Sequence, residues 1–169
     1  MKKAPEWLIV CGCGLFIFIL WLSAYFQADI RWLHFFQAWM YAATVWLGLR
    51  RNRWGYFIGI SAAGLWDFSS LFVNNFVMSG LRWLAAWISS GQPKHVDQMI
   101  ALPAFTGNFL VLAGCLWAYA RLPQKPLSDS VRFLAAFALA TGFFAAAMAV
   151  FQPRYLGLFH ALAHPHWPR

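Results

Sequence analysis

The sequence predicts an all-α protein, a polytopic helical membrane protein with about five transmembrane helices and one short interfacial helix. Its 169 residues are 62% hydrophobic and only 11% charged, whereas soluble domains carry about 45–50% apolar and about 25% charged residues. A chain this short leaves too much of its surface exposed to hide so many apolar side chains in one soluble core. Apolar runs of membrane-spanning length alternate with short polar segments. We therefore expect residues 1–169 to form a single transmembrane helical bundle.

The formal net charge of +8 would suggest nucleic-acid binding in a soluble protein. Here the basic residues lie between the apolar runs, which is the pattern of membrane topology. No motif of an RNA- or DNA-binding domain is present. The partner that the composition predicts is the lipid bilayer, and nucleic acid is not expected.

The first two predicted spans cover residues 7–26 and 32–49. The first has about the 20 residues that a transmembrane helix needs. A cleavable signal peptide is the alternative for this segment, but its apolar stretch is too long and no small-x-small pair precedes a cleavage point. The second span ends at a basic stop formed by Arg50, Arg51 and Arg53.

The third span, residues 54–77, contains Asp67, the only acidic residue inside any apolar run. Gly55, Gly59 and Ala63 lie four residues apart and lead along one helix face to Asp67. Small residues allow close helix contact in lipid, and an intramembrane carboxylate indicates a functional site by default. We expect the other helices to pack around this one.

After the third span the pattern changes, because Ser79 and Gly80 interrupt the apolar run. In residues 81–89, leucines, isoleucine and tryptophans recur at helical spacing and Arg82 is the only charge, which is typical of a helix lying at the membrane interface. A continuous extension of the third helix is the alternative, and the sequence leaves the choice open.

The fourth and fifth spans are predicted at residues 98–120, with a possible kink at Pro103, and at residues 131–151. The fifth has a face of small residues at alternating spacings of three and four, and phenylalanines on another side. The small face is expected to pack inward and the bulky face to meet lipid. Its members are Ala135, Ala138, Gly142, Ala145 and Ala149.

The distribution of Lys and Arg near the span ends predicts the orientation. With the N-terminus inside, eight basic residues lie on the inner side and five on the outer side, which is the bias that cytoplasmic loops show. We therefore predict an integral protein of a bacterial inner membrane, with its N-terminus inside and its C-terminus outside.

Polar residues gather in the outer half of the predicted bundle. On the second span, polar side chains recur at spacings of three and four, and on the third span they follow Asp67 toward the outside. The sequence predicts a polar pocket between spans two, three and four that opens to the outer face. Helix–helix contact, worth about 0.6 kcal/mol for each polar group in membranes, is the alternative role. The candidate ligand- or ion-binding residues are Asp67, His34, Gln37, Tyr41, Ser70, Asn74 and Asn108.

Asp67 in such a pocket would be protonated or would pair with His34.

The C-terminal tail holds His160 and His164, four residues apart, and His166 just beyond Pro165. This spacing fits a transition metal that favours imidazole ligands, or a haem. Interfacial histidines without a ligand are the alternative. The common catalytic signatures of zinc hydrolases, c-type haem attachment, serine hydrolases and phosphate-binding loops are absent from the sequence.

Three functions remain open at this stage. The first is a small membrane protein that binds or passes a small ligand, ion or proton through the polar pocket. The second is an accessory or scaffold subunit, whose partners would be other membrane subunits or a second copy of the chain. The third, a metal- or haem-dependent enzyme using the outer histidines, is the least favoured because no catalytic motif supports it. The sequence identifies neither the ligand, nor a direction of transport, nor the oligomeric state.

Overall fold

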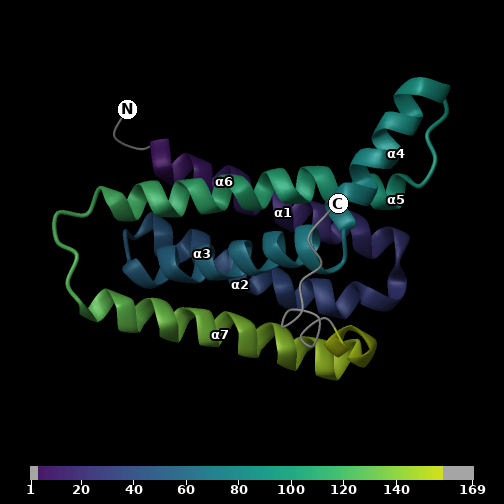
Figure 1. The fold of residues 1–169 in the computed structure, drawn as a ribbon. Coiled ribbons are helices and arrows are strands. Elements are labelled where there is room, and N and C mark those ends of the chain that lie inside the picture. The colour runs from purple at the N-terminus through teal and green to yellow at the C-terminus, as the bar shows by residue number, and fades with distance from the viewer. Residues whose placement is uncertain (1–3, 158–169) are drawn as a thin grey trace.

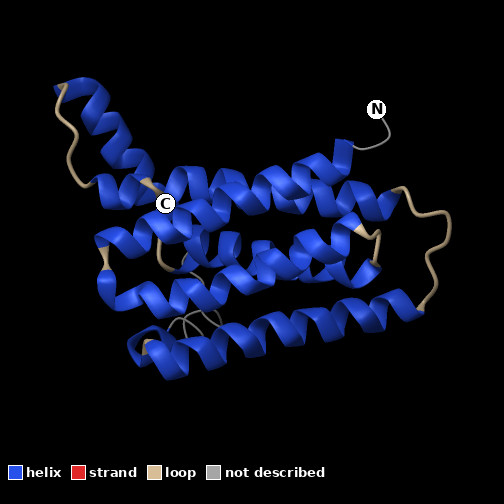
Figure 2. Ribbon diagram, turned by 180° about the vertical axis from the view of Figure 1, so that it is seen from behind, coloured by secondary structure: helices blue, strands red, loops and turns tan. Residues whose placement is uncertain are grey.

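The computed structural model describes residues 4–157, and within them the chain is a bundle of long helices lying side by side (Figure 1). No strand occurs in this part of the chain (Figure 2), so the all-α prediction is confirmed there. Two short irregular helical turns, η1 and η2, connect longer helices, and a third, η3, follows the last long helix. The elements are α1 (Ala4–Phe26), η1 (Ala28–Ile30), α2 (Arg31–Leu49), α3 (Arg53–Phe68), η2 (Ser69–Val73), α4 (Phe76–Ser90), α5 (Val96–Met99), α6 (Ala101–Ala120), α7 (Ser128–Phe151) and η3 (Pro153–Leu156).

Three of the described helices are long and apolar enough to cross a membrane: α1, the segment Val96–Ala120 and α7. The number of candidate spans becomes four if α3, η2 and the bent continuation α4 are taken together as one span. The prediction of five spans is not confirmed. Helix α2 is not among these helices, because its polar stripe and its tryptophans lower its mean hydropathy. The apolar helices are compatible with a membrane location.

Helix α3 packs against α2, α6 and α7. Helix α1 lies instead against α2 and α6, and it meets α3 through an edge-to-face contact of Phe16 and Trp66, whose ring centroids are 5.3 Å apart. The expectation that the other helices surround the third span therefore describes α2, α6 and α7, whereas α1 belongs to a second layer.

Glycines allow the closest helix contacts. A Cβ atom built on Gly12 of α1 would lie 2.6 Å from the backbone oxygen of Gly107 in α6. On α3, a Cβ atom on Gly55 would lie 2.6 Å from the backbone nitrogen of Gly48, and one on Gly59 would lie 2.7 Å from the Cys115 sulfur. The close contacts expected from the small residues of the third span are confirmed at both positions.

The third span does not continue to residue 77 as predicted. Helix α3 ends at Phe68, a π-helical turn follows to Val73, and the next helix leaves at an angle of 62°. The bend lies at Asn75, whose φ of 53° is left-handed, a conformation that asparagine tolerates better than most residues. The continuous extension is thus excluded, and the helix predicted at 81–89 begins earlier, at Phe76.

Gly80 explains why the start of α4 was misplaced. The sequence suggests a helix break there, but Gly80 is a buried residue inside α4. A Cβ atom on it would lie 2.9 Å from the backbone oxygen of Gln98. Gly80 therefore provides a close approach to α5 rather than an end to the helix.

The inward face of α7 was predicted wrongly. Ala136, Ala140, Phe144 and Ala147 are the buried apolar residues of this helix. The predicted face is largely exposed, and a Cβ atom on Gly142 would touch nothing within 4 Å. Alanines occur on two faces of α7, so the spacing of small residues could not identify the buried one.

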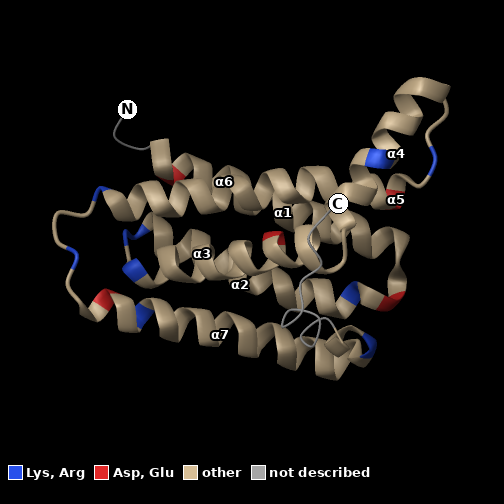
Figure 3. Cartoon of the chain, in the orientation of Figure 1, with Lys and Arg blue, Asp and Glu red and all other residues tan. Residues whose placement is uncertain are grey.

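Most charged residues lie toward the two ends of the bundle (Figure 3). At the end where α2 meets α3 and α6 leads to α7, the buried carboxylate of Asp129 accepts hydrogen bonds from Arg53 at 3.2 Å, Arg132 at 2.9 Å and Tyr119 at 3.2 Å. We call this group the Asp129 cluster. It ties α3, α6 and α7 together.

At the opposite end, Asp29 of η1 forms an ion pair with Arg154 of η3. The side-chain amide of Gln152 also donates to the backbone oxygen of Asp29 at 2.6 Å. This pair of contacts joins the α1–α2 turn to the segment after α7. We call this the cavity end, because the larger cavity of the structure lies here.

Candidate functional site

A cavity of about 490 Å³ lies at the cavity end of the bundle. It is an open cavity lined by α2, α3, η2 and α7, with contributions from the ends of α1, α4 and α5. The sequence predicted a pocket between spans two, three and four. In the structure the fourth span contributes through α5 and not through α6, and α7 forms the remaining wall. The polar residues in the lining are Ser23, Gln27, His34, Gln37, Ser69, Ser70, Asn74, Ser79, Asp97 and Gln98.

His34 and Gln37 reach the cavity from one face of α2, because they lie three residues apart on a helix. The Nδ1 atom of His34 donates to the backbone oxygen of Leu20 at 2.8 Å, since a carbonyl oxygen only accepts. This bond fixes the ring between α1 and α2. The other ring nitrogen, Nε2, has no hydrogen-bond partner among residues 4–157.

Ser70 and Asn74 enter the lining from the irregular segment after α3. The Ser70 hydroxyl donates to the backbone oxygen of Asp67 at 3.1 Å, and the Asn74 side-chain oxygen accepts from the backbone nitrogen of Phe76 at 3.0 Å. Both bonds hold the π-helical turn and the bend in place. π-Helical turns are frequent at functional sites, and here the turn directs two polar side chains to the cavity.

Asp67 is not part of the cavity lining, although its neighbours Trp66, Ser69 and Ser70 are. Its Oδ1 atom is buried and has no hydrogen-bond partner in the described part of the chain. The pairing with His34 that the sequence left open is not formed, because the one hydrogen bond of His34 goes to Leu20. The residue that first indicated a site therefore lies beside the cavity.

Tyr41 and Asn108 also lie outside the lining, in the core next to it. The Tyr41 hydroxyl of α2 donates to the side-chain oxygen of Asn108 in α6 at 2.7 Å. Both side chains are fully buried, and the Tyr41 ring packs on Phe16 with centroids 4.4 Å apart. The amide nitrogen of Asn108 has no partner among the described residues. These two residues act as a polar contact between helices.

Four of the seven predicted binding residues thus share one cavity: His34, Gln37, Ser70 and Asn74. Asp97 and Gln98 of α5 were not predicted as site residues. The turn-forming residues before them favoured a loop, and only their position at the start of an apolar run could have indicated that they face the bundle. Gln98 accepts a hydrogen bond from the Trp83 indole at 3.0 Å, which joins α4 to α5.

The charge of the lining follows from its composition. Among the described residues that line the cavity, Asp97 is the only acidic one, none is a lysine or arginine, and His34 and Tyr155 are the other titratable groups. Asp97 forms no ion pair with any residue between 4 and 157. The aromatic part of the wall comes from Trp66, Phe76, Phe144 and Tyr155.

The predicted metal or haem ligands His160, His164 and His166 lie outside the described residues. Within residues 4–157, no group of three or more His, Cys, Asp or Glu side chains is close enough to hold a metal ion. The metal or haem site stays a prediction of the sequence.

Ligand cavities in proteins commonly have volumes of about 300–1,000 Å³ and combine apolar walls with a few convergent polar groups. The cavity of about 490 Å³ falls in this range and has both kinds of wall. Comparison of the chain with protein-family models, curated proteins and solved structures finds no match.

Proposed function

We propose that this chain is a small integral membrane protein that binds a small polar ligand in the cavity lined by α2, α3, η2 and α7. The observation that carries the proposal is the convergence of His34, Gln37, Ser70 and Asn74 on a space of about 490 Å³. An unpaired polar group in an apolar environment costs roughly 1–3 kcal/mol. Water or a ligand in the cavity would supply the missing partners.

The lining also restricts the chemistry of the ligand. Asp97 would attract a cation or a hydrogen-bond donor, and no lysine or arginine among residues 4–157 lines the cavity to neutralise an anion. Aromatic faces such as those of Trp66 and Phe76 add the possibility of cation–π contact. The ligand class we propose is a small cationic or neutral polar molecule, rather than an anion.

The proposal includes a transmembrane topology in which α1, α2, α3, α6 and α7 all cross the bilayer. It is supported by the parallel arrangement of these helices (Figure 1) and by the basic residues at both ends (Figure 3). The cavity would then face the outer side. The orientation and the bacterial inner membrane stay predictions of the sequence.

Passage of an ion or proton is the further part of this proposal. Passage would depend on buried polar groups outside the cavity lining: Asp67 Oδ1 and the amide nitrogen of Asn108 have no hydrogen-bond partner in the described part of the chain. Binding alone does not require these groups. The two activities are separable by experiment, because only passage depends on the buried polar groups beyond the cavity.

The binding test is a thermal-shift measurement on the full chain in mild detergent, with a panel of small ammonium compounds, neutral polyols and amides, and carboxylates. We expect a cationic or neutral compound to raise the unfolding midpoint. Gln37→Leu should reduce the apparent affinity for it at least tenfold, whereas Gln92→Leu, an exposed loop change outside the lining, should leave it unchanged. Equal affinities in both variants, or stabilisation by carboxylates alone, would contradict the proposal.

A second candidate function is that of an accessory subunit of a larger membrane assembly. It is favoured by the exposed small-residue face of α7, which includes Ala135, Ala138 and Gly142. Small residues in lipid allow close contact with another helix. Purification in mild detergent distinguishes the two: stable companion proteins favour the accessory role, and a single monodisperse species argues against it.

A further inference from the structure

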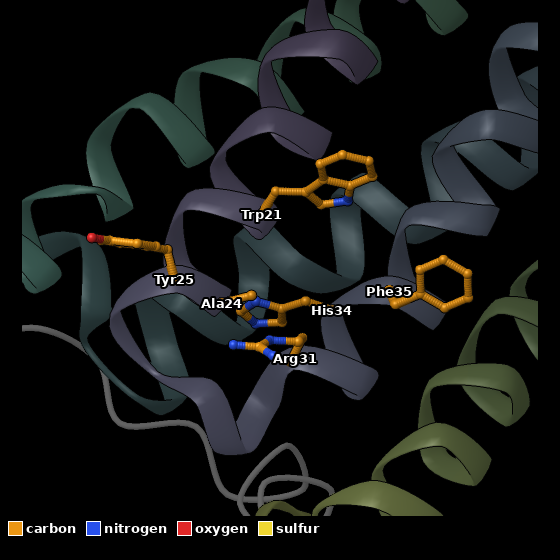
Figure 4. A pocket seen from close by; sticks show the side chains of 6 residues that line it. All are labelled: Trp21, Ala24, Tyr25, Arg31, His34 and Phe35. Atoms are coloured by element: carbon orange, nitrogen blue, oxygen red, sulfur yellow. The ribbon is translucent and has the colours of Figure 1, made fainter.

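A second, smaller cavity lies between α1 and α2 on the outer surface of the cavity end. Its volume is about 290 Å³, and its lining consists of Trp21, Ala24, Tyr25, Arg31, His34 and Phe35 (Figure 4). We call it the α1–α2 groove. Its lining differs from that of the larger cavity, and among the described residues only His34 belongs to both linings.

Arg31 supplies a free positive charge to the groove. It is exposed and forms no ion pair or hydrogen bond with another side chain in residues 4–157. The nearest acidic residue along the chain, Asp29, is engaged by Arg154. The guanidinium group therefore keeps its fork of N–H donors, which matches phosphate geometry.

The other walls of the groove are aromatic and unusually exposed. Trp21 is 62%, Tyr25 81% and Phe35 42% exposed. In Figure 4, Arg31 and His34 lie next to each other, Trp21 lies beyond them on α1, and Tyr25 and Phe35 flank the group on opposite sides. Tryptophan and tyrosine prefer the level of the lipid headgroups, where one part of the ring is apolar and another is hydrated.

We propose that the α1–α2 groove binds an anionic phospholipid, with Arg31 donating to the phosphate and the aromatic rings contacting the upper acyl chain. Two features together support this assignment: the unpaired guanidinium of Arg31 attracts the headgroup, and the apolar walls of the groove suit a lipid tail. A free phosphate would use only Arg31. The inference depends on the proposed membrane location, but not on any ligand in the larger cavity.

Native mass spectrometry of the full chain in mild detergent tests the proposal with phosphatidylglycerol and phosphatidylcholine as probes. We expect phosphatidylglycerol to be retained in preference to phosphatidylcholine. Arg31→Gln should reduce that retention about tenfold, the loss expected for a charge-assisted hydrogen bond. The matched control is Arg82→Gln on α4, another exposed arginine without a described ion pair, and it should have no effect.

A second pair of variants tests the aromatic wall without changing any charge. Trp21→Ala should lower retention of phosphatidylglycerol several-fold, while Trp7→Ala, an equally exposed tryptophan at the other end of α1 (65% against 62%), should not. Equal retention of the two lipids, or the same loss in Arg31→Gln and Arg82→Gln, would overturn the proposal.

Two further outcomes would overturn the phospholipid proposal, because they would identify another occupant of the α1–α2 groove. Displacement of the lipid by millimolar glycerol phosphate would mean that the site recognises a soluble anion. A dimer that Arg31→Gln dissociates would mean that a second copy covers the groove. Neither outcome affects the thermal-shift test of the larger cavity, so the two proposals fail separately.

Discussion

The contact between α1 and α6 makes a sharp prediction for Gly12. A methyl group there would lie 2.6 Å from the backbone oxygen of Gly107 and 2.8 Å from the backbone nitrogen of Val111. Both atoms belong to a helix backbone and cannot rotate away. Gly12→Ala therefore forces α6 to move by about 0.8 Å to reach ordinary contact at 3.4 Å.

The magnitude follows from the packing that this movement loosens. A radial gap of about 0.5–1 Å forfeits roughly a quarter to a half of each dispersion contact, and overpacking in cores costs typically about 1–3 kcal/mol. Ile9, Cys13 and Phe16 of α1 are fully or almost fully buried nearby. We expect Gly12→Ala to lower the free energy of unfolding by about 2–3 kcal/mol, or the thermal midpoint by about 5–10 °C.

The matched control is Gly14→Ala in the same helix. A Cβ atom on Gly14 would meet nothing within 4 Å, so only helix propensity changes, and alanine should stabilise by about 0.5–1 kcal/mol. The assay is thermal unfolding of both variants in the same mild detergent. Unfolding is monitored as the loss of the monodisperse peak in size-exclusion chromatography. If Gly12→Ala unfolds no earlier than Gly14→Ala, the α1–α6 contact is wrong.

Three other substitutions test further features of the structure. Asp129→Asn removes the carboxylate that three side chains share. It should lower the free energy of unfolding by about 1–3 kcal/mol, measured as a lower unfolding midpoint. An unchanged midpoint would mean that the Asp129 cluster is not formed. Asn75→Ala should cost about 1 kcal/mol because its φ of 53° is left-handed, whereas Asn75→Gly should be neutral, and equal midpoints would argue against the bend. Asp67→Asn should leave ligand affinity within about twofold, because Asp67 does not line the cavity, and isothermal titration showing a larger loss would place it in contact with the ligand.

Composition and spacing predicted the helical class and several specific contacts because these depend on local features. Gly55 and Gly59 face neighbouring helices as their spacing indicates. His34 and Gln37 reach one cavity because residues three apart share a helix face. Each of these predictions needs only the geometry of a single helix.

The features that sequence reasoning missed depend on contacts between distant segments. Nothing in the sequence around Asp129 indicates that Arg53 and Tyr119 would meet it. The buried face of α7 is set by which neighbour its alanines contact, and alanines occur on both candidate faces. Asp67 was given the central role because of its chemistry alone, whereas its position relative to the cavity depends on the π-helical turn after Phe68.

The irregular backbone and the polar cavity are physically connected. The chain breaks its helices at η1, at the bend of Asn75 and at Ile100 before α6, and all three breaks are at the cavity end. In hydrocarbon, non-helical backbone is tolerated only where it is buried in protein or lines a hydrated cavity. Two polar side chains of the lining also hold this backbone in place, because Ser70 donates to the backbone oxygen of Asp67 and Asn74 accepts from the backbone nitrogen of Phe76. Gln37→Leu therefore has to be compared with wild type for folding as well as for binding, because it places an apolar side chain in the wall that these bends also line.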